Sequence, residues 1–234
     1  MEKPLPRRWQ WLLLELLGVF LGVTLAFSLD KWNEARKLHE VETQILREID
    51  AGLAMDLQDL EANIEGHRMG LAAVQVFRKY LTGQAVNLDS MPFHYFVLLR
   101  DFISLQNSAA YESLKSQGLG LIRNDSLRLK IVALYDFDME VLQKLEEDYS
   151  EMQFNENFYH AFNDALADYM VWNREGQLRR IRAPEGLPAS TTNRLLAHLW
   201  KIEANRRFTL QYYQLVKGKA LELRQDLARA LNGR

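Results

Sequence analysis

The chain has 234 residues, a formal net charge of −2 and no cysteine. Hydrophobic residues make up 48% and charged residues 26% of the sequence, which is the composition of a folded protein of one or two domains. The near-neutral charge argues against a dedicated nucleic-acid-binding protein. Without cysteine the chain can form no disulfide, no thiolate metal site and no cysteine nucleophile.

The first feature along the chain is an apolar run, WLLLELLGVFLGVTLAFSL, at residues 11–29. As a helix rising about 1.5 Å per residue it would cover roughly 28 Å, close to the hydrocarbon thickness of a bilayer, about 30 Å. Trp9 and Trp11 on one side and Trp32 on the other suit the two interfacial belts of a membrane. These features predict a single-pass membrane anchor at residues 1–33.

A cleaved signal peptide is the alternative reading of this run, because Ala26-Phe27-Ser28 resembles a cleavage site. Glu15 inside the run and the length of the run favour an uncleaved anchor. Basic residues flank the run almost equally, with Lys3, Arg7 and Arg8 before it and Lys31, Arg36 and Lys37 after it. A short basic leader normally stays in the cytoplasm, so we expect the remaining chain on the outer side, with the cytoplasmic side as the alternative.

One face of this predicted anchor carries Glu15, Gly18, Gly22 and Ala26, which follow a 3-4-4 spacing. Two glycines four residues apart let a pair of membrane helices approach closely. A carboxylate in the centre of a membrane costs about 2.5–3.5 kcal/mol, so Glu15 needs a specific environment. It could reach the interface, form hydrogen bonds within a homo-oligomer, or line a pore, and the sequence leaves these three roles open.

Residues 34–234 are predicted to form one helical domain. Apolar residues recur every three or four positions through residues 41–64, and the stripe continues to Leu81, so the anchor should run directly into a long stalk helix. Further helices are expected at residues 91–105, at 108–118 up to the Gly118 break, after Asn124, and from a cap at Ser190, Thr191 or Thr192 to about Leu231. Residues 173–190 read as the main loop, and no segment has the alternation of a strand. The predicted fold is an all-α elongated bundle.

Three stretches together resemble a widespread, uncharacterised family of bacterial single-pass membrane proteins, a domain of unknown function. They are residues 15–37, in which a glutamate-headed span ends at Trp32-Asn33-Glu34; the following helix, with Gln44, Leu46 and Asp50; and residues 111–135, with the turn Asn124-Asp125-Ser126. Asp30-Lys31 stand where family members often have an amide residue before the tryptophan. The resemblance implies an uncleaved anchor in the bacterial inner membrane and a helical domain, and it implies no activity. The short basic leader makes the periplasmic side the expected place of this domain, with the cytoplasmic side as the alternative.

Candidate chemistry is sparse in this sequence. His39 with Glu42, and His160 with Asp164, could share helix faces as ligand pairs, but a bundle metal site needs matching ligands from several helices, so we predict solvated faces and no metal or cofactor. No nucleophile elbow or P-loop is present, and we predict that the protein is not an enzyme. An aromatic-rich stretch between Tyr149 and Trp172 is predicted to be ordinary core rather than a pocket lining.

Four arginines gather in the predicted main loop, and they could meet anionic headgroups or the acidic patch of a partner: Arg174, Arg179, Arg180 and Arg182. The function expected from all these features is that of a membrane-anchored scaffold or sensor that acts through homo-oligomerisation. A homo-oligomeric ion channel is the first alternative and an enzyme the second. The expected partners are membrane lipid and further copies of the chain, with another membrane protein as a further candidate, and nucleic acid is not expected.

Overall fold

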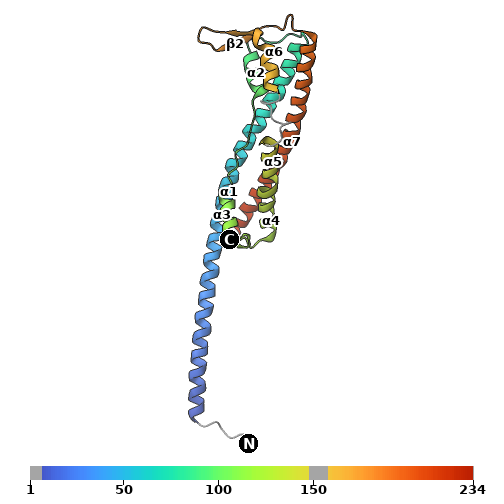
Figure 1. The fold of residues 1–234 in the computed structure, drawn as a ribbon. Coiled ribbons are helices and arrows are strands. Elements are labelled where there is room, and N and C mark those ends of the chain that lie inside the picture. Colours follow the sequence, from blue (N-terminus) through green and yellow to red (C-terminus); the bar gives the residue numbers. More distant parts are fainter. Residues whose placement is uncertain (1–6, 148–157, 234) are drawn as a thin grey trace.

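A computed structural model describes residues 7–147 and 158–233 of the chain (Figure 1), although the side chains of residues 7–10 and 12–14 are outside the description. Most of these residues are helical, which confirms the all-α class. The helices and strands follow in this order: α1 (Arg7–Leu81), α2 (Met91–Leu99), α3 (Ala109–Gln117), a 3-10 turn (Leu119–Leu121), α4 (Asp125–Ala133), a π-helix (Leu134–Met139), α5 (Glu140–Glu147), α6 (His160–Leu166), a second 3-10 turn (Ala167–Tyr169), β1 (Met170–Trp172), β2 (Leu178–Ile181) and α7 (Ala189–Asn232).

Helix α1 is continuous over 75 residues, as the sequence predicts for an anchor that runs into a stalk. At about 1.5 Å per residue it is roughly 110 Å long. It ends where Gly83 adopts a positive φ of 72°, a conformation that glycine reaches without steric cost. In Figure 1 the first part of α1 extends alone toward the N-terminus, and all other elements lie along its second half.

Helices α1 and α7 form the antiparallel spine of the bundle and enclose two separate apolar cores (Figure 1). The lower core, nearer the N-terminus of α1, joins residues 45–64 of α1 to α3, α4, the π-helix, α5 and residues 213–227 of α7. The upper core joins residues 73–81 of α1 to α2, α6, Ile181 of β2 and residues 195–202 of α7. Burial of these two sets of side chains provides the main driving force for folding.

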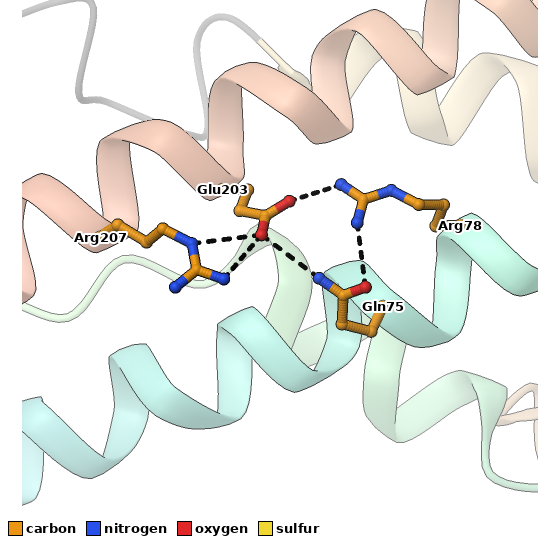
Figure 2. A network of polar contacts seen from close by, with 4 residues as sticks. All are labelled: Gln75, Arg78, Glu203 and Arg207. Carbon is orange, nitrogen blue, oxygen red and sulfur yellow. Dashed lines mark hydrogen bonds and ion pairs between the residues drawn. The ribbon is translucent and has the colours of Figure 1, made fainter.

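An ion-pair network crosses the spine beside the upper core, as Figure 2 shows. Arg78 of α1 donates from Nη2 to Glu203 Oε2 of α7 at 2.5 Å, and Arg207 donates to Glu203 Oε1 at 2.8 Å. Gln75 donates to the same carboxylate at 3.3 Å. The hydrogen bonds from Arg78 and Arg207 lower the pKa of Glu203. The network fixes the register of α1 against α7, although partly exposed pairs of this kind contribute only about 1 kcal/mol or less to stability.

Several predicted helix ends are confirmed. Gly118, with a φ of 101°, ends α3, and the Asn124 side chain caps α4 by accepting the backbone N–H of Leu127 at 3.1 Å. Two predicted ends are wrong. Helix α2 stops at Leu99 and not at Leu105, and α7 begins at Ala189 directly after Pro188, without a side-chain cap from Ser190, Thr191 or Thr192.

A small β-hairpin overlaps the predicted main loop: β1 ends directly before residue 173, and β2 lies within residues 173–190. Strands β1 and β2 pair antiparallel, with Met170 opposite Ile181, and Gly176 takes a φ of 75° in the connecting turn. Tyr80 donates its hydroxyl to the Arg182 carbonyl at 2.7 Å, which places the hairpin against the end of α1. Strands of three and four residues are too short for an alternating pattern to stand out in the sequence.

The chain between α2 and α3 is extended and lies along α1, and we call residues 100–107 the strap. Carboxylates of α1 hold its backbone, because Leu105 N donates to Asp59 at 2.9 Å and Asn107 N donates to Asp56 at 2.7 Å. Ideal Cβ geometry at Gly66 would place a methyl group 2.2 Å from the Phe102 ring. Glycine at this position of α1 is therefore required for the strap to pack so closely.

Within the described part of the chain, no helix has both the length and the apolar character needed to cross a membrane. The predicted anchor at residues 1–33 also includes residues 1–6, which lie outside the described residues. The side chains of Leu12, Leu13 and Leu14, which belong to the apolar run in the sequence, lie outside the description as well.

We expect Gly66→Ala to lower the free energy of unfolding by about 1–3 kcal/mol, because the added methyl group overlaps the Phe102 ring. Urea denaturation of the full chain measures this change. Gly218→Ala is the matched control, since nothing lies within 4 Å of a Cβ at that helical position and the change should leave stability equal or raise it by up to about 1 kcal/mol. Equal stabilities of the two variants would show that the strap does not pack against Gly66.

Candidate functional site

The face predicted for association is fully exposed on α1. Every side chain of residues 15–38 is exposed, including Glu15, Trp32 and the neighbours of Gly18 and Gly22. Apart from the adjoining residues and backbone of the same helix, no described atom lies within 4 Å of an ideal Cβ at either glycine. Ala26 continues this face, whereas the side chain of Trp9 lies outside the description. The predicted face is thus present and available to another molecule.

Apolar side chains surround this part of α1 on all sides. Trp11 is 69% exposed, Leu16 70% and Phe20 67%. Because consecutive helical residues are about 100° apart, the neighbouring exposed residues cover the full circumference: Leu17, Val19, Leu21, Val23, Leu25, Phe27 and Leu29. A helix that is apolar all round is normally buried in a protein or a membrane. No described part of this chain covers it.

The predicted arginine cluster lies at the opposite end of the molecule, on the hairpin. Arg180 Nε is 3.8 Å from Asp89 Oδ1, and Arg182 donates to the Asp168 carbonyl. Arg174 and Arg179 belong to the same hairpin, and Glu175 and Glu185 lie among the four arginines. Along α1 the hairpin is about 70 Å from Trp32, which separates it from lipid around the predicted anchor. Both predicted partners of this cluster, anionic headgroups and the acidic patch of a protein, therefore stay predictions.

The predicted solvated face at His39 and Glu42 is wrong for Glu42, which is buried and has a structural role. The Glu42 carboxylate is buried and accepts the backbone N–H of Arg123 at 3.0 Å, while His39 Nδ1 lies 3.6 Å from it. Arg123 also donates to the Ala35 carbonyl at 3.1 Å. Glu42 therefore holds the turn before α4 against α1. Among the residues the structure describes, no three histidine or acidic side chains gather as a metal site.

The predicted aromatic core is confirmed for Phe158 and Phe162 and is wrong for Tyr159 and Trp172, which are exposed. Phe158 and Phe162 are buried in the upper core, where the Phe158 ring packs on His198 at 5.4 Å between centroids. Tyr149 and Phe154 lie outside the described residues. Tyr159 is 43% exposed and borders an open cavity of about 740 Å³ between α2, the strap and β2, so part of the aromatic stretch does line a pocket.

A polar cluster that the sequence reasoning missed separates the two cores. We call its members, which come from α1, the strap, α5 and α7, the polar layer: Asp59, His67, Ser104, Glu146, Arg206 and Tyr213. Its central residue is Arg206, whose side chain is completely buried. Nη2 donates to the carbonyls of Leu98 at 3.0 Å and Arg100 at 2.9 Å. Leu98 lies in the last turn of α2 and Arg100 is its C-cap residue, so the cation caps this helix at the end that favours positive charge.

The fit of Arg206 depends on its surroundings. A Cβ at Gly70 would lie 2.5 Å from the guanidinium carbon, so this second glycine of α1 makes room for the side chain. The Phe102 ring lies 5.4 Å from the same carbon. Burial lowers the pKa of Arg206 to about 10, with Asp101 acting in the opposite direction, so the group stays cationic at neutral pH. A buried cation of this kind requires such acceptors to be stable.

His67 is the partner of Arg206 on α1. Its Nδ1 lies 3.3 Å from Arg206 Nη1 and accepts from it, which assigns the ring proton to Nε2. Burial lowers the pKa of His67 to about 3, and the charge of Arg206 adds to this effect. The ring packs against those of Phe102 and Tyr213, with centroids 5.6 and 5.3 Å away. His67 is therefore a neutral acceptor and cannot serve as a cation in this fold.

Glu146 of α5 completes the polar layer. Its carboxylate accepts the backbone N–H and the hydroxyl of Ser104, both at 3.2 Å, and the hydroxyl of Tyr213. Burial raises the pKa of Glu146 to about 7, while the hydrogen bonds from Tyr213 and Ser104 lower it. The only sequence signal for the polar layer was the pair Gly66 and Gly70, because glycine inside a helix usually has a packing reason.

No family model, no curated protein and no solved structure matches this chain. The resemblance to a bacterial membrane-protein family therefore stays a prediction.

The low pKa of His67 predicts a pH-dependent contribution to stability. Folding keeps His67 neutral down to about pH 3, whereas the unfolded chain binds a proton below about 6.5. The contribution is therefore complete above pH 6.5 and falls by up to about 1.4 kcal/mol per pH unit below it. We expect the stability advantage of the native chain over His67→Asn to shrink as the pH falls from 7 to 5, measured by urea denaturation.

Glu146 affects the pH dependence of stability in the opposite direction, but it is present in both chains. Its effect therefore cancels when the stability of His67→Asn is subtracted from that of the native chain. A stability difference that does not change between pH 7 and pH 5 would contradict the buried, neutral state of His67.

Proposed function

We propose that the protein is a membrane-anchored helical scaffold that self-associates through the N-terminal part of α1. The observation that carries this proposal is the exposed apolar surface around residues 11–32. In water this surface is unfavourable by about 25 cal/mol per Å². Lipid can cover it on all sides, and a second copy can cover the face with Gly18 and Gly22.

The position of the bundle on α1 fits such an anchor. Arg123 donates to the Ala35 carbonyl, one helical turn beyond Trp32. With Trp32 at the lipid headgroups, the turn at Arg123 would lie close to the membrane surface, the lower core would begin about 20 Å from it, and the hairpin would lie about 70 Å away. We place the protein in the bacterial inner membrane with the bundle on the periplasmic side, following the resemblance and the basic leader.

Self-association is supported by the geometry of the two glycines. Their open surroundings leave a flat face on which a second helix can pack closely, as small residues four apart do in membranes. Glu15 lies on the same face, where it could form a hydrogen bond to a second copy. Among the described residues, no specific observation favours the alternative functions of a pore or an enzyme.

We expect the double variant Phe20→Lys/Val23→Lys to lose binding to phosphatidylcholine vesicles in a flotation assay. Each lysine is disfavoured by about 3 kcal/mol in the centre of a membrane, so two should reduce partitioning by more than about 1,000-fold. Leu129→Lys is the control, because this leucine of α4 is also exposed, at 66%, but lies in the bundle. Flotation of the double variant at the native level would argue against a membrane anchor.

We expect Gly22→Leu to weaken self-association at least about tenfold, because the larger side chain separates the helices. Mass measurement of the full chain in mild detergent tests this, with Gly218→Leu as control at a helical glycine of α7 that is equally open. Neither change should disturb the monomer. Assemblies of the same mass and stability in all three proteins would exclude this face as the interface.

A further inference from the structure

The strap is the only described covalent link between α2 in the upper core and α3 in the lower core, and it crosses the spine at the polar layer. Both apolar cores end at this level, since the lower core reaches Ile64 of α1 and the upper core begins at Ala73. The contacts at this level include the hydrogen bonds of the polar layer beside the ring packing of His67, Phe102 and Tyr213. Such a level is a natural place for local opening, because polar contacts exchange readily with water.

Glu146 is the residue through which α5 holds the strap. From the strap it faces Ser104 N and Oγ, and from α7 it faces the Tyr213 hydroxyl. From α1 it faces the carboxylate of Asp59, which accepts Leu105 N and the Asn63 amide. Among the residues described, no lysine or arginine pairs with Glu146, because the Arg206 guanidinium is bound to the end of α2 and to His67.

We propose that the polar layer is a pH-sensitive joint, in which ionisation of Glu146 beside Asp59 releases the strap from α5 and loosens the upper core from the lower one. The closed joint holds the half-buried carboxylate next to a second acidic group, with no cation paired to it among the described residues. The open joint exposes it to water, which solvates the charge.

Proton linkage gives the direction of this effect. In the closed joint the pKa of Glu146 is about 7, whereas the solvated group has a value of 4.5. The closed joint therefore binds the proton more tightly, and it is favoured as the pH falls through neutral. Between pH 6 and pH 8 the open fraction should rise about tenfold through Glu146 alone. Exposure of His67 on opening would lower the open fraction as the pH rises over this range, so the experiment must separate the effects of Glu146 and His67.

Hydrogen–deuterium exchange of residues 100–107 in the full chain, held in detergent micelles, provides this test. We expect the ratio of exchange rates between the native chain and Glu146→Gln to rise about tenfold from pH 6 to pH 8. The ratio cancels both the intrinsic pH dependence of exchange and the effect of His67. Glu147→Gln is the matched control at the exposed neighbouring carboxylate, and its ratio should stay constant.

A ratio for Glu146→Gln that does not change with pH, or that falls, would overturn the proposal. If Glu146→Gln does not fold, Tyr213→Phe serves in its place. This variant removes the hydrogen bond that lowers the pKa of Glu146, so the midpoint of the strap's response should move to higher pH. An unchanged midpoint would overturn the proposal equally.

Discussion

The bundle is organised around the burial of one cation, the guanidinium of Arg206. Its charge must be met by acceptors, and the nearest are the last carbonyls of α2, so that helix ends where the guanidinium lies. The chain then continues as the extended strap, and Gly66 and Gly70 leave space for the strap and the guanidinium on α1. His67 must stay neutral to accept from the same group. The burial of this one charge thus accounts for the end of α2, for the glycines at positions 66 and 70, and for the tautomer of His67.

Local patterns in the sequence were enough to predict the all-α class, the continuous α1 and the Asn124 cap, because each depends on residues close together along the chain. The end of α2 could not be predicted, since the apolar pattern continues through Ile103 and Leu105. What stops the helix is Arg206, about a hundred residues away in the sequence. The polar layer was missed for the same reason: its members become neighbours only when α1 and α7 pack. The spacing of Gly18 and Gly22 was enough to predict that they share one helix face, and the role of this face stays a proposal.

The two halves of α1 differ in what covers them. From Val41 onward one stripe is apolar and the opposite side polar, as suits a helix packed against α7 and the strap. Before Leu38 the described side chains are exposed on every side, and apolar ones dominate up to Leu29. One uninterrupted helix therefore passes from a surface that the bundle covers to one that no described part of the chain covers.

The continuity of α1 has a mechanical consequence. The helix has no break from Arg7 to Leu81, so it transmits rotation about its axis. The rotational orientation of its N-terminal segment therefore sets the direction in which the hairpin and the cavity beside α2 point. One residue inserted between Trp32 and Val41 would turn the whole bundle by about 100° and raise it by about 1.5 Å. The number of residues between Trp32 and Val41 thus fixes which surface the end of the bundle with the hairpin presents to neighbouring molecules.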